Sequence, residues 1–353
     1  MKVLYISDRR TGGIASHVKC LAECLPPDVG RYVIGVGGDE PFAGRSGHDV
    51  REFFQIRRVI REFKPDVVHF HIPNLLMALY VRLSKLFNLS TLKPFNSETF
   101  QPFNLLCSWH TPTNRSPSAG QRLFLWLLGK ECYFLPVSTP TWEGLRKWLP
   151  QAKGEVFHNP MKIGGEKRWR WTKDGNDLVV GMVGRNDDQK DWPAFHKVES
   201  IVQARLSQLK SADPLSTSTS SLHLSFLNAG EKEACDGREA IAKMDLFVMT
   251  SKHEELPTTV LECFALGTPV CGFVPVGGMS DILKLSSGPL REAFVAERSC
   301  EKLSDVVLDL LSHPEKRQAL VEDGRQVLEG HFDAEKNCRG RLMEIYEKCA
   351  AKG

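Results

Sequence analysis

The chain contains 353 residues, of which 42% are hydrophobic and 25% are charged, with a formal net charge of +3. This composition excludes a fibrous or disordered protein, and the length favours two compact domains over one. No apolar run approaches the roughly 20 residues of a membrane-spanning helix. The apolar opening at residues 1–7 is interrupted too early by Asp8, Arg9 and Arg10 to serve as a secretory signal.

The spacing of the cysteines indicates a cellular compartment, and the distribution of charge indicates a kind of binding partner. Cys20, Cys24, Cys263 and Cys271 fall in apolar helix or strand patterns, and no Cys-x2-Cys pair occurs, so we expect reduced cysteines and a cytoplasmic protein. Residues 1–175 hold 25 Lys/Arg and 15 Asp/Glu, a net +10, whereas the remainder holds 21 and 28, a net −7. Scattered basic residues without a recognition motif argue against nucleic acid. A membrane surface or an anionic acceptor is the better match for the basic half.

The first half alternates strand and helix patterns. Strands are predicted over 2–7, 32–36, 67–71, 105–110 and 133–137, and helices over 14–25, 49–63, 74–87, 120–130 and 141–148. Repeated strand–helix units predict a doubly wound parallel sheet with ligand sites at the C-terminal ends of its strands. Gly12, His71, His110 and Ser138 all fall at such ends.

The second half repeats this pattern after a polar connection over 156–177. Strands are predicted over 178–183, 222–227, 246–249 and 269–274, and helices over 192–209, 238–242, 257–266, 301–312, 314–328 and 334–350. The Ser/Thr-rich segment 211–221 is the one low-complexity stretch and is expected to be a loop. A second α/β domain is therefore predicted.

Segment 251–282 contains the most informative group of candidate ligand-binding residues. Pro257 suits the first position of a helix, which we expect to run to Leu266 and to end at Gly267. Glu254 lies in the preceding loop and Glu262 eight residues later in the helix. Free amides at a helix N-terminus attract phosphate, and carboxylates accept hydrogen bonds from sugar hydroxyls. The segment therefore predicts a nucleotide-sugar site.

This segment resembles the Glu-x7-Glu motif of retaining GT-B glycosyltransferases, in particular family 4. Further matches follow the order of that family along the chain: Gly12-Gly13 with His17, Pro65-Asp66-Val67-Val68-His69, His110, Val137-Ser138, His158-Asn159-Pro160, and Gly184-Arg185 with Lys190-Asp191. The resemblance implies the GT-B fold, with two doubly wound, Rossmann-like parallel-sheet domains facing across a cleft and a C-terminal helix crossing back to the N-terminal domain. It implies an acceptor-side domain over 1–160, a linker over 161–177, a nucleotide-sugar-binding domain over 178–330 and a crossover helix over 331–353.

The resemblance also implies roles for residues of the second domain. Arg185 and Lys190 would hold the donor diphosphate, for which Arg offers a planar fork and Lys a point charge. Glu262 would accept hydrogen bonds from the ribose hydroxyls, and Glu254 would lie near the donor sugar ring. The backbone amides of Leu256 and Thr258 are the expected phosphate contacts. Without that context, solvated surface charges are the better explanation of Arg185 and Lys190, and a capping or surface acid is the alternative for each glutamate.

One position departs from the family pattern, because Glu255 stands where a glycine commonly follows the first glutamate. An acid beside a phosphate site must point away or change which donor fits. The preference for a donor sugar is therefore left open at this point.

In the first domain, the resemblance places His110 near the donor sugar and the reacting centre. A partly buried structural histidine is the alternative explanation of this residue. Gly12, Gly13 and His17 would line the acceptor side of the cleft. We expect the side chains of His69 and His71 to project to opposite faces of their strand, and we assign no metal and no cofactor. The nucleotide sugar is a substrate.

Segment 121–130, with Arg146, Lys147 and Trp148, combines bulky apolar and basic residues. It can lie on a membrane surface, where lipid-linked acceptors are found, or pack its apolar side into the core. If the segment lies on a membrane, the protein is expected in the cytoplasm at the inner membrane surface, as a peripheral membrane protein.

The function implied is transfer of a sugar from a nucleotide diphosphate-sugar to an acceptor hydroxyl, a glycan or lipid-linked one, with the anomeric configuration kept. Two alternatives remain: a non-catalytic nucleotide-sugar-binding subunit of a transferase complex, and a nucleotide-sugar epimerase on the same fold.

Overall fold

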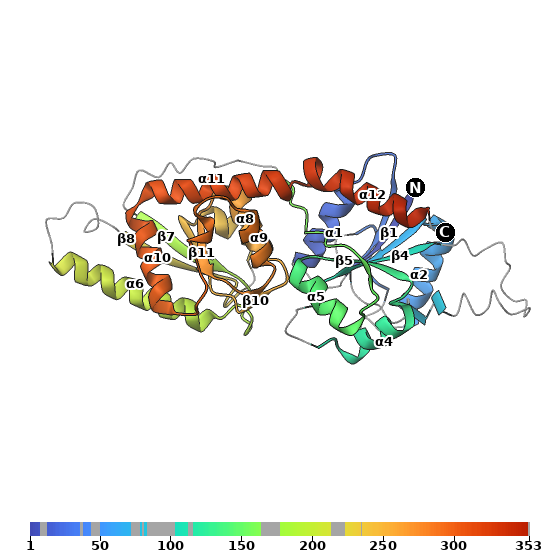
Figure 1. Cartoon of the computed structure of the whole chain (residues 1–353), viewed down its shortest axis with the longest axis horizontal. Coiled ribbons are helices and arrows are strands. Elements are labelled where there is room, and N and C mark those ends of the chain that lie inside the picture. The colour runs from blue at the N-terminus through green and yellow to red at the C-terminus, as the bar shows by residue number, and fades with distance from the viewer. Residues whose placement is uncertain are drawn as a thin grey trace, which may run out of the picture. The chain divides into compact units, whose positions relative to one another are not determined.

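The computed structural model describes residues 1–7, 13–35, 38–43, 50–71, 78–79, 81–82, 103–111, 116–163, 177–212, 223–233 and 235–351. The chain divides into two compact units (Figure 1). The first unit comprises Met1–Lys162 together with Ala334–Gly353, and the second comprises Ile163–Asp333. Each unit is described by itself below.

The first unit is built on a six-stranded sheet with the order β2-β1-β3-β4-β5-β6. The strands are β1 (Lys2–Ile6), β2 (Gly30–Ile34), β3 (Val67–Phe70), β4 (Asn104–Trp109), β5 (Cys132–Pro136) and β6 (Lys153–Gly154). All neighbouring strands pair in parallel. The chain leaves β1 toward β2 on one side and returns to β3 on the other. The gap between β1 and β3 is therefore the topological switch point of this sheet.

Helices cover both faces of the first sheet. They are α1 (Gly13–Cys24), α2 (Val50–Phe63), α4 (Ala119–Leu128), α5 (Thr139–Trp148) and α12 (Arg339–Ala350). One core cluster joins α2, α4 and α5 to the sheet, with Ile56 and Phe124 among its members. The other joins α1 and α12 to the opposite face, where Tyr346 of α12 donates a hydrogen bond to Tyr5 of β1 at 2.9 Å. The C-terminal helix thus packs on the N-terminal sheet, as the sequence predicted.

The second unit is built on a five-stranded parallel sheet with the order β13-β11-β9-β7-β8. The strands are β7 (Asp177–Val183), β8 (His223–Ala229), β9 (Leu246–Met249), β11 (Val270–Phe273) and β13 (Phe294–Val295). A separate parallel pair joins β10 (His253–Glu254) to β12 (Val276–Gly277). Because β8 and β9 flank β7, the switch point of this sheet lies between β7 and β9.

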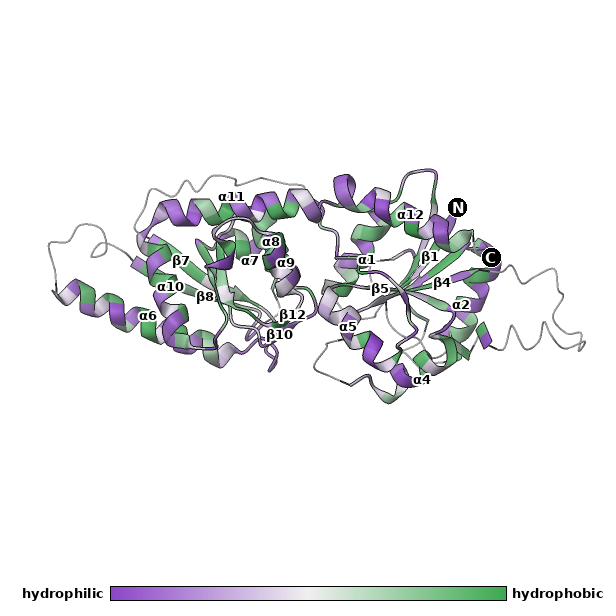
Figure 2. Cartoon of the chain, viewed as in Figure 1, coloured by the Kyte–Doolittle hydropathy of each residue, from purple (hydrophilic) through white to green (hydrophobic). Residues whose placement is uncertain are grey.

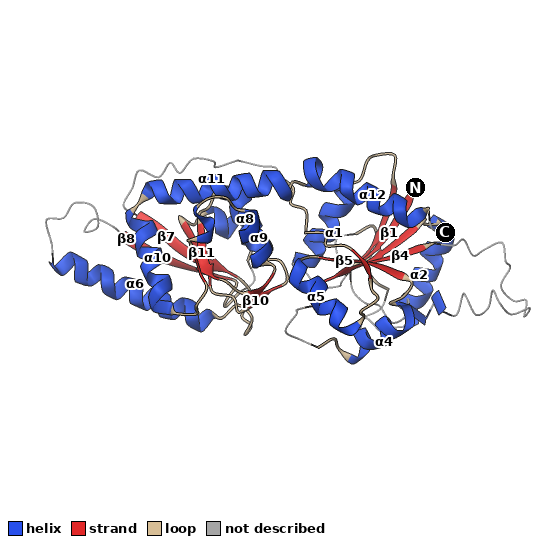
Figure 3. Ribbon diagram, in the orientation of Figure 1, coloured by secondary structure: helices blue, strands red, loops and turns tan. Residues whose placement is uncertain are grey.

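The helices of the second unit surround this sheet (Figure 3). They are α6 (Trp192–Ala212), α7 (Gly237–Ala242), α8 (Thr258–Leu266), α9 (Met279–Leu285), α10 (Cys300–Ser312) and α11 (Pro314–His331), with a short 3-10 helix at Pro289–Arg291. Figure 2 shows the helices of both units striped in hydrophilic and hydrophobic colours, as expected of helices with one face on a sheet.

The predicted fold class, two α/β domains with parallel sheets, is confirmed. Several local details differ from the predictions. Pro257 is the N-cap of α8, so the helix begins one residue later than expected, and the final helix opens with a π-helical turn at Ala334–Cys338. The short elements β6, β10, β12, β13 and α9 were not predicted. Most of the predicted helix over 74–87, and most of the low-complexity segment 211–221, lie outside the described residues.

The ten cysteines all lie within described parts of the chain, and no disulfide joins any of them. Across the described helices, none combines the length and the apolar character that a bilayer crossing requires.

Candidate functional site

The switch point of the second sheet brings two loops together. One loop follows β7 and runs through Gly184 to Asp191, and the other follows β9 from Thr250 to Lys252. The backbone N–H of Lys252 donates to the carbonyl of Gln189 at 2.8 Å. The hydroxyl of Thr250 lies 3.1 Å from the carbonyl oxygens of both Lys190 and Asp191. These bonds fix the first loop against the second.

Lys190 and Glu254, predicted separately from the sequence, are ion-pair partners. The Lys190 Nζ lies 2.6 Å from Glu254 Oε1, and the side chains are only 12% and 8% exposed. Gly184 makes room for this lysine, because a Cβ at Gly184 would lie 2.9 Å from the Cγ and Cδ of Lys190. A charge this well enclosed interacts strongly with any anion that reaches it.

Arg185 lies in the same loop but points its charge to solvent. Its side chain is 72% exposed and pairs with Asp187 at 3.3 Å. Its carbonyl accepts a hydrogen bond from Trp192 Nε1 at 3.1 Å, which fixes the backbone. The guanidinium is thus free to take a second anionic partner at small cost, since exposed ion pairs stabilise little.

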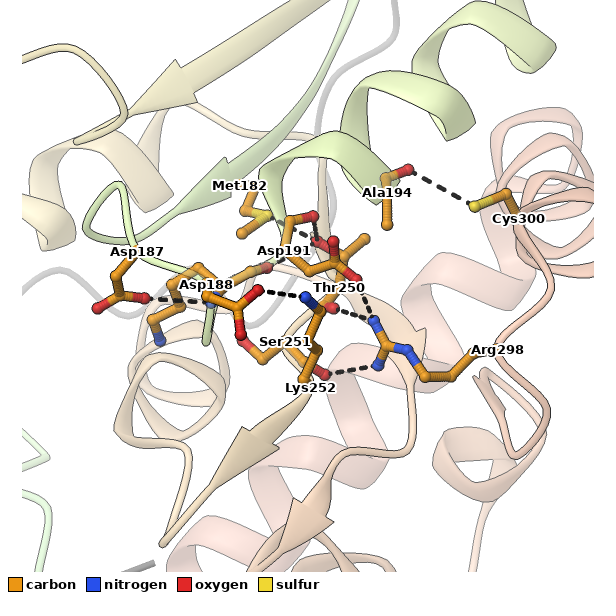
Figure 4. Close-up of polar contacts among 11 residues, drawn as sticks. Met182, Asp187, Asp188, Asp191, Ala194, Thr250, Ser251, Lys252, Arg298 and Cys300 are labelled. Atoms are coloured by element: carbon orange, nitrogen blue, oxygen red, sulfur yellow. Dashed lines mark hydrogen bonds and ion pairs between the residues drawn. The ribbon is translucent and has the colours of Figure 1, made fainter. Parts of the chain in front are cut away.

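Arg298, which the sequence analysis did not single out, joins the two loops (Figure 4). Its Nη2 lies 2.6 Å from Asp191 Oδ2 and donates to the Thr250 carbonyl at 2.8 Å, while Nη1 donates to the Ser251 carbonyl at 3.0 Å. The guanidinium also lies 4.7 Å from the centre of the Phe273 ring. Asp191 itself has a positive φ of 55°. The loop conformation is therefore held by a side chain distant in sequence.

The N-terminus of α8 completes this site. Pro257 caps the helix without a side-chain hydrogen bond, and the amides of Thr258 and Thr259 precede the first intrahelical bonds, which begin at Val260. Free amides of this kind attract phosphate. Leu256, whose amide was the other predicted phosphate contact, is buried.

Two glycines that sequence reasoning missed pack against the segment carrying Glu254. The backbone N–H of Gly278 donates to the Glu254 carbonyl at 2.8 Å. A Cβ at Gly277, whose φ is 127°, would lie 1.9 Å from that carbonyl oxygen, and one at Gly278 would lie 2.3 Å from the Glu255 carbonyl. Only glycine allows this approach. The pair Gly277-Gly278, in an otherwise apolar segment, was a usable signal.

Glu262 lies further along α8 and is partly buried. Burial raises its pKa above the ordinary value of 4.5, against the opposing charge of Arg238. Among the described residues its carboxylate makes no hydrogen bond or ion pair. A carboxylate of this kind is suited to accept hydrogen bonds from a ligand's hydroxyl groups.

The switch point of the first sheet is lined by histidines instead of charges. His17 lies in the first half of α1, His71 directly follows β3 and His110 directly follows β4. The ring centroids of His17 lie 5.2 Å from His71 and 5.4 Å from His110, and those of His71 and His110 are 6.0 Å apart. Burial lowers the pKa of all three, that of His110 to about 4, so the rings are neutral at pH 7.

His69 lies beside this cluster but is fully hydrogen bonded. Its Nδ1 lies 2.8 Å from the Tyr346 hydroxyl and its Nε2 lies 2.9 Å from Ser108 Oγ. The rings of His69 and His71 are 4.3 Å apart. The prediction that these two side chains project to opposite faces was therefore wrong, because residues two apart on a strand share a face.

The remaining predicted site residues belong to the loop after β1. Gly12 lies outside the described residues, and Gly13 is the first residue of α1. The structure thus brings Lys190 together with Glu254 in the second unit, and His17 together with His110 in the first.

Comparison with known proteins agrees with this architecture. Residues 222–327 match the protein family described as glycosyl transferases group 1. HepE of Anabaena, solved in complex with UDP-glucose, superposes with a TM-score of 0.69 at 13% sequence identity, covering 99% of this chain and 100% of that one. Sucrose-phosphate synthase from Thermosynechococcus elongatus superposes over the full length of both chains, with a TM-score of 0.68 at 14% identity.

The chain has the GT-B fold, and its residues 222–327 are similar to the group 1 glycosyl transferases. The matched residues include Glu254, α8 and Arg298, whereas Lys190 and Asp191 of the charged site precede them. A GDP-mannose-dependent alpha-mannosyltransferase of Mycobacterium tuberculosis (strain CDC 1551 / Oshkosh) is 27% identical over 257 residues, which are 65% of this chain and 61% of that protein. The lipopolysaccharide core biosynthesis glycosyltransferase LpsE of Rhizobium meliloti (strain 1021) is 32% identical over 100 residues, 28% of each chain. The chain therefore spans less than two thirds of the length of either relative.

Proposed function

We propose that this protein is a retaining glycosyltransferase of the family 4 type, which transfers a sugar from a nucleotide diphosphate-sugar to an acceptor hydroxyl. The observation that carries the proposal is the enclosed pair of Lys190 and Glu254 beside the N-terminus of α8. A cation and free helix amides at a switch point suit a diphosphate, and the neighbouring carboxylates suit sugar hydroxyls.

In this proposal the donor binds to the second unit. Arg185, Lys190 and the amides near Leu256 and Thr258 hold the diphosphate, and Glu262 accepts hydrogen bonds from the ribose. The names of two similar proteins support this class of donor, since one is a GDP-mannose-dependent enzyme and the other was solved with UDP-glucose. These names carry different bases and sugars, so the proposal extends to the class and not to one donor.

The chemical step breaks the bond between the anomeric carbon and the diphosphate oxygen, and forms a bond from that carbon to the acceptor oxygen on the same face. The acceptor's proton passes to the departing phosphate oxygen, so no protein base is required. Negative charge grows on the leaving diphosphate, and Lys190 with Arg185 stabilises it electrostatically. Lys190 must exchange part of its contact with Glu254 for the phosphate, which leaves Glu254 available to the donor sugar. No metal ion takes part at the diphosphate in this proposal.

The first unit is proposed to bind the acceptor, over the loop of Gly12 and Gly13 and beside His17. His110, neutral because of its lowered pKa, can donate one hydrogen bond and accept another at the reacting centre.

The enzyme is proposed to work in the cytoplasm at the inner membrane surface. Its acceptor would be a glycan or a lipid-linked molecule used in the assembly of cell-surface polysaccharide or glycolipid. On α4 and α5, Leu123, Trp126 and Trp148 are 42%, 78% and 45% exposed. Arg122 lies 6.0 Å from the Trp148 ring, so basic and aromatic groups share this surface. Such a combination is typical of protein surfaces that lie on anionic membranes.

The proposal is tested by nucleotide release from UDP-, GDP- and ADP-sugars, with and without a lipid or glycan extract as acceptor. Acceptor-dependent release from one donor, lost in Lys190→Ala and Glu254→Gln, is the expected result. Donor binding without release, under acceptors that serve a known transferase, would indicate a binding subunit instead. Conversion of the donor into an isomeric sugar would indicate an epimerase.

A further inference from the structure

A chain of hydrogen-bonded side chains runs through the interior of the first unit. Tyr346 of α12 donates to the hydroxyl of Tyr5 on β1 at 2.9 Å. The Nδ1 of His69 on β3 lies 2.8 Å from the Tyr346 hydroxyl, and its Nε2 lies 2.9 Å from the Oγ of Ser108 on β4. All four residues are at most 2% exposed. One buried network therefore joins three strands of the sheet to the C-terminal helix.

The hydroxyl protons of this network fix where His69 carries its own proton. Burial lowers the pKa of His69 below its ordinary value of 6.5, so the ring is neutral at pH 7 and has a single N–H. Tyr346 gives its only hydroxyl proton to Tyr5, so its oxygen can only accept from His69. The proton of His69 therefore lies on Nδ1, and Nε2 accepts a hydrogen bond from Ser108.

The ring of His71 packs against this network. Its centroid lies 4.3 Å from that of His69 and 6.0 Å from that of Tyr5. Both ring nitrogens of His71 are buried and have no hydrogen-bond partner among the described residues. Packing against these two rings, and not hydrogen bonds of its own, therefore sets the orientation of His71.

His71 in turn lies between two residues that are proposed to face the substrates. Its ring centroid is 5.2 Å from that of His17 and 6.0 Å from that of His110. Closely packed interiors transmit small shifts of one side chain to the next. A rotation of His71 would therefore displace the rings of both neighbours.

We propose that Tyr346 is a positioning residue, which holds His69 in its Nδ1–H form and thereby fixes the ring of His71 beside the proposed transfer site. The docking of α12 does not itself require this hydroxyl, because Leu342 and Ile345 bury apolar side chains in the same core cluster. A buried hydroxyl costs free energy unless it is hydrogen bonded, whereas a fully bonded network selects one arrangement of its rings. The link to sugar transfer rests on the proposed function, but the form of His69 can be measured without it.

The test compares full-length wild type and Tyr346→Phe by ¹⁵N NMR of the histidine rings at pH 7, with His69→Gln and His71→Gln to assign the signals. We expect wild-type His69 to carry its proton on Nδ1. In Tyr346→Phe no oxygen accepts from Nδ1, so the proton should move to Nε2 and be donated to Ser108. The signals of His71 should shift with it.

The matched control is Tyr133→Phe, which removes a tyrosine hydroxyl of the same unit that is hydrogen bonded to Glu155 at 2.9 Å. It should leave the signals of both histidines unchanged. In the transfer assay, Tyr346→Phe should lower kcat about fivefold, the equivalent of one hydrogen bond. Its donor affinity should stay within twofold of wild type, because the proposed diphosphate contacts lie in the second unit, and Tyr133→Phe should change neither quantity.

Two NMR results would overturn the role of Tyr346. One is a wild-type His69 that carries its proton on Nε2, which can be found even if Tyr346→Phe does not fold. The other is a set of His71 signals that is the same in wild type and Tyr346→Phe. An equal loss of kcat in Tyr346→Phe and Tyr133→Phe would likewise contradict a positioning role. Absence of transfer by the wild type would contradict the proposed function, and the NMR comparison would then still decide whether Tyr346 fixes His69 and His71.

Discussion

The two units present the same part of the same topology to a ligand, but with opposite electrostatic character. The second sheet's switch point is lined by ion pairs, Lys190 with Glu254 and Arg298 with Asp191. The first sheet's switch point is lined by buried neutral imidazoles. The parallel sheet fixes where a ligand binds, and the loop residues decide what kind of ligand it is.

The two sites also differ in which existing ion pairs or hydrogen bonds must break when a ligand binds. In the second unit the cations already have partners, so a diphosphate bound as proposed would have to replace a carboxylate at 2.6 Å from Lys190. In the first unit His17 and His71 have no partners among the described residues to lose. We therefore expect ligand binding to depend on charge exchange at the second site, and on desolvation and hydrogen bonding at the first.

The largest effect is expected from Lys190→Ala. The variant removes the enclosed cation that is proposed to stabilise the leaving diphosphate, and should lower the rate of transfer by about 10²–10³-fold. It also leaves Glu254 buried without its ion-pair partner, so the unfolding midpoint should fall. Steady-state nucleotide release and thermal unfolding measure the two effects.

The control for that experiment is Lys197→Ala, which removes a lysine on α6 whose ion pair with Glu301 is exposed. It should change neither the rate nor the midpoint measurably. Comparable losses in both variants would mean that the enclosed charge of Lys190 has no special role, and the comparison between the two units would lose its basis.

A smaller loss of function is expected from Glu262→Gln, and this variant should be more stable than the wild type at pH 7, whereas Lys190→Ala should be less stable. The folded state raises the pKa of Glu262, so the folded protein binds a proton more readily than the unfolded chain. Stability contributed by the protonated form is present below pH 4.5 and is lost as the pH rises through the raised pKa. At pH 7 the glutamine variant should therefore unfold at a higher temperature than the wild type.

The same variant should bind the donor about tenfold or more weakly, because a hydrogen bond from a hydroxyl to a charged acceptor contributes about 1.5–3 kcal/mol. Wild-type donor affinity should rise with pH through the pKa of Glu262, and the variant should lose that dependence. A variant that binds the donor as tightly as the wild type at every pH would show that Glu262 does not contact it.

His110→Ala tests the contribution of the first unit. The loss of one neutral hydrogen-bonding group should lower the rate of transfer by about tenfold, since such bonds contribute about 1 kcal/mol. Donor affinity, measured by calorimetry, should stay within twofold of wild type because the diphosphate contacts are intact. His110→Asn, which keeps one donor, should retain more activity than the alanine variant. A large loss of donor affinity would move His110 into the donor site.

The smallest effect is expected from Arg298→Lys. Lysine keeps the charge beside Asp191 but cannot form the fork to the carbonyls of Thr250 and Ser251. The loop that contains Lys190 should become less rigidly held. We therefore expect the donor KM to rise a few-fold and the free energy of unfolding to fall by about 1 kcal/mol. Asp191→Asn, alone and combined with Arg298→Lys, gives the coupling energy. Strict additivity of the two changes would contradict a shared role in holding the loop.

Much of the second site was predictable because its signals are local. The short apolar strand β9, Pro257 and Gly267 together bounded α8 within one residue, and Glu254, Glu262 and Lys190 followed from a recognisable spacing. Arg298 was missed because its partners, Asp191 and Thr250, are joined only through the folded loops. The histidine cluster was missed for a similar reason, since it depends on the order of three strands, and for a second one: the side-chain alternation of β3 was misjudged.

Calorimetric titration shows whether the donor diphosphate binds to the charged site of the second unit. Wild type, Lys190→Ala and His110→Ala would each be titrated with UDP, GDP, ADP and their sugars. We expect one nucleotide series to bind the wild type and His110→Ala with similar affinity and to bind Lys190→Ala at least tenfold more weakly. Equal affinity for wild type and Lys190→Ala, or a loss confined to His110→Ala, would contradict it.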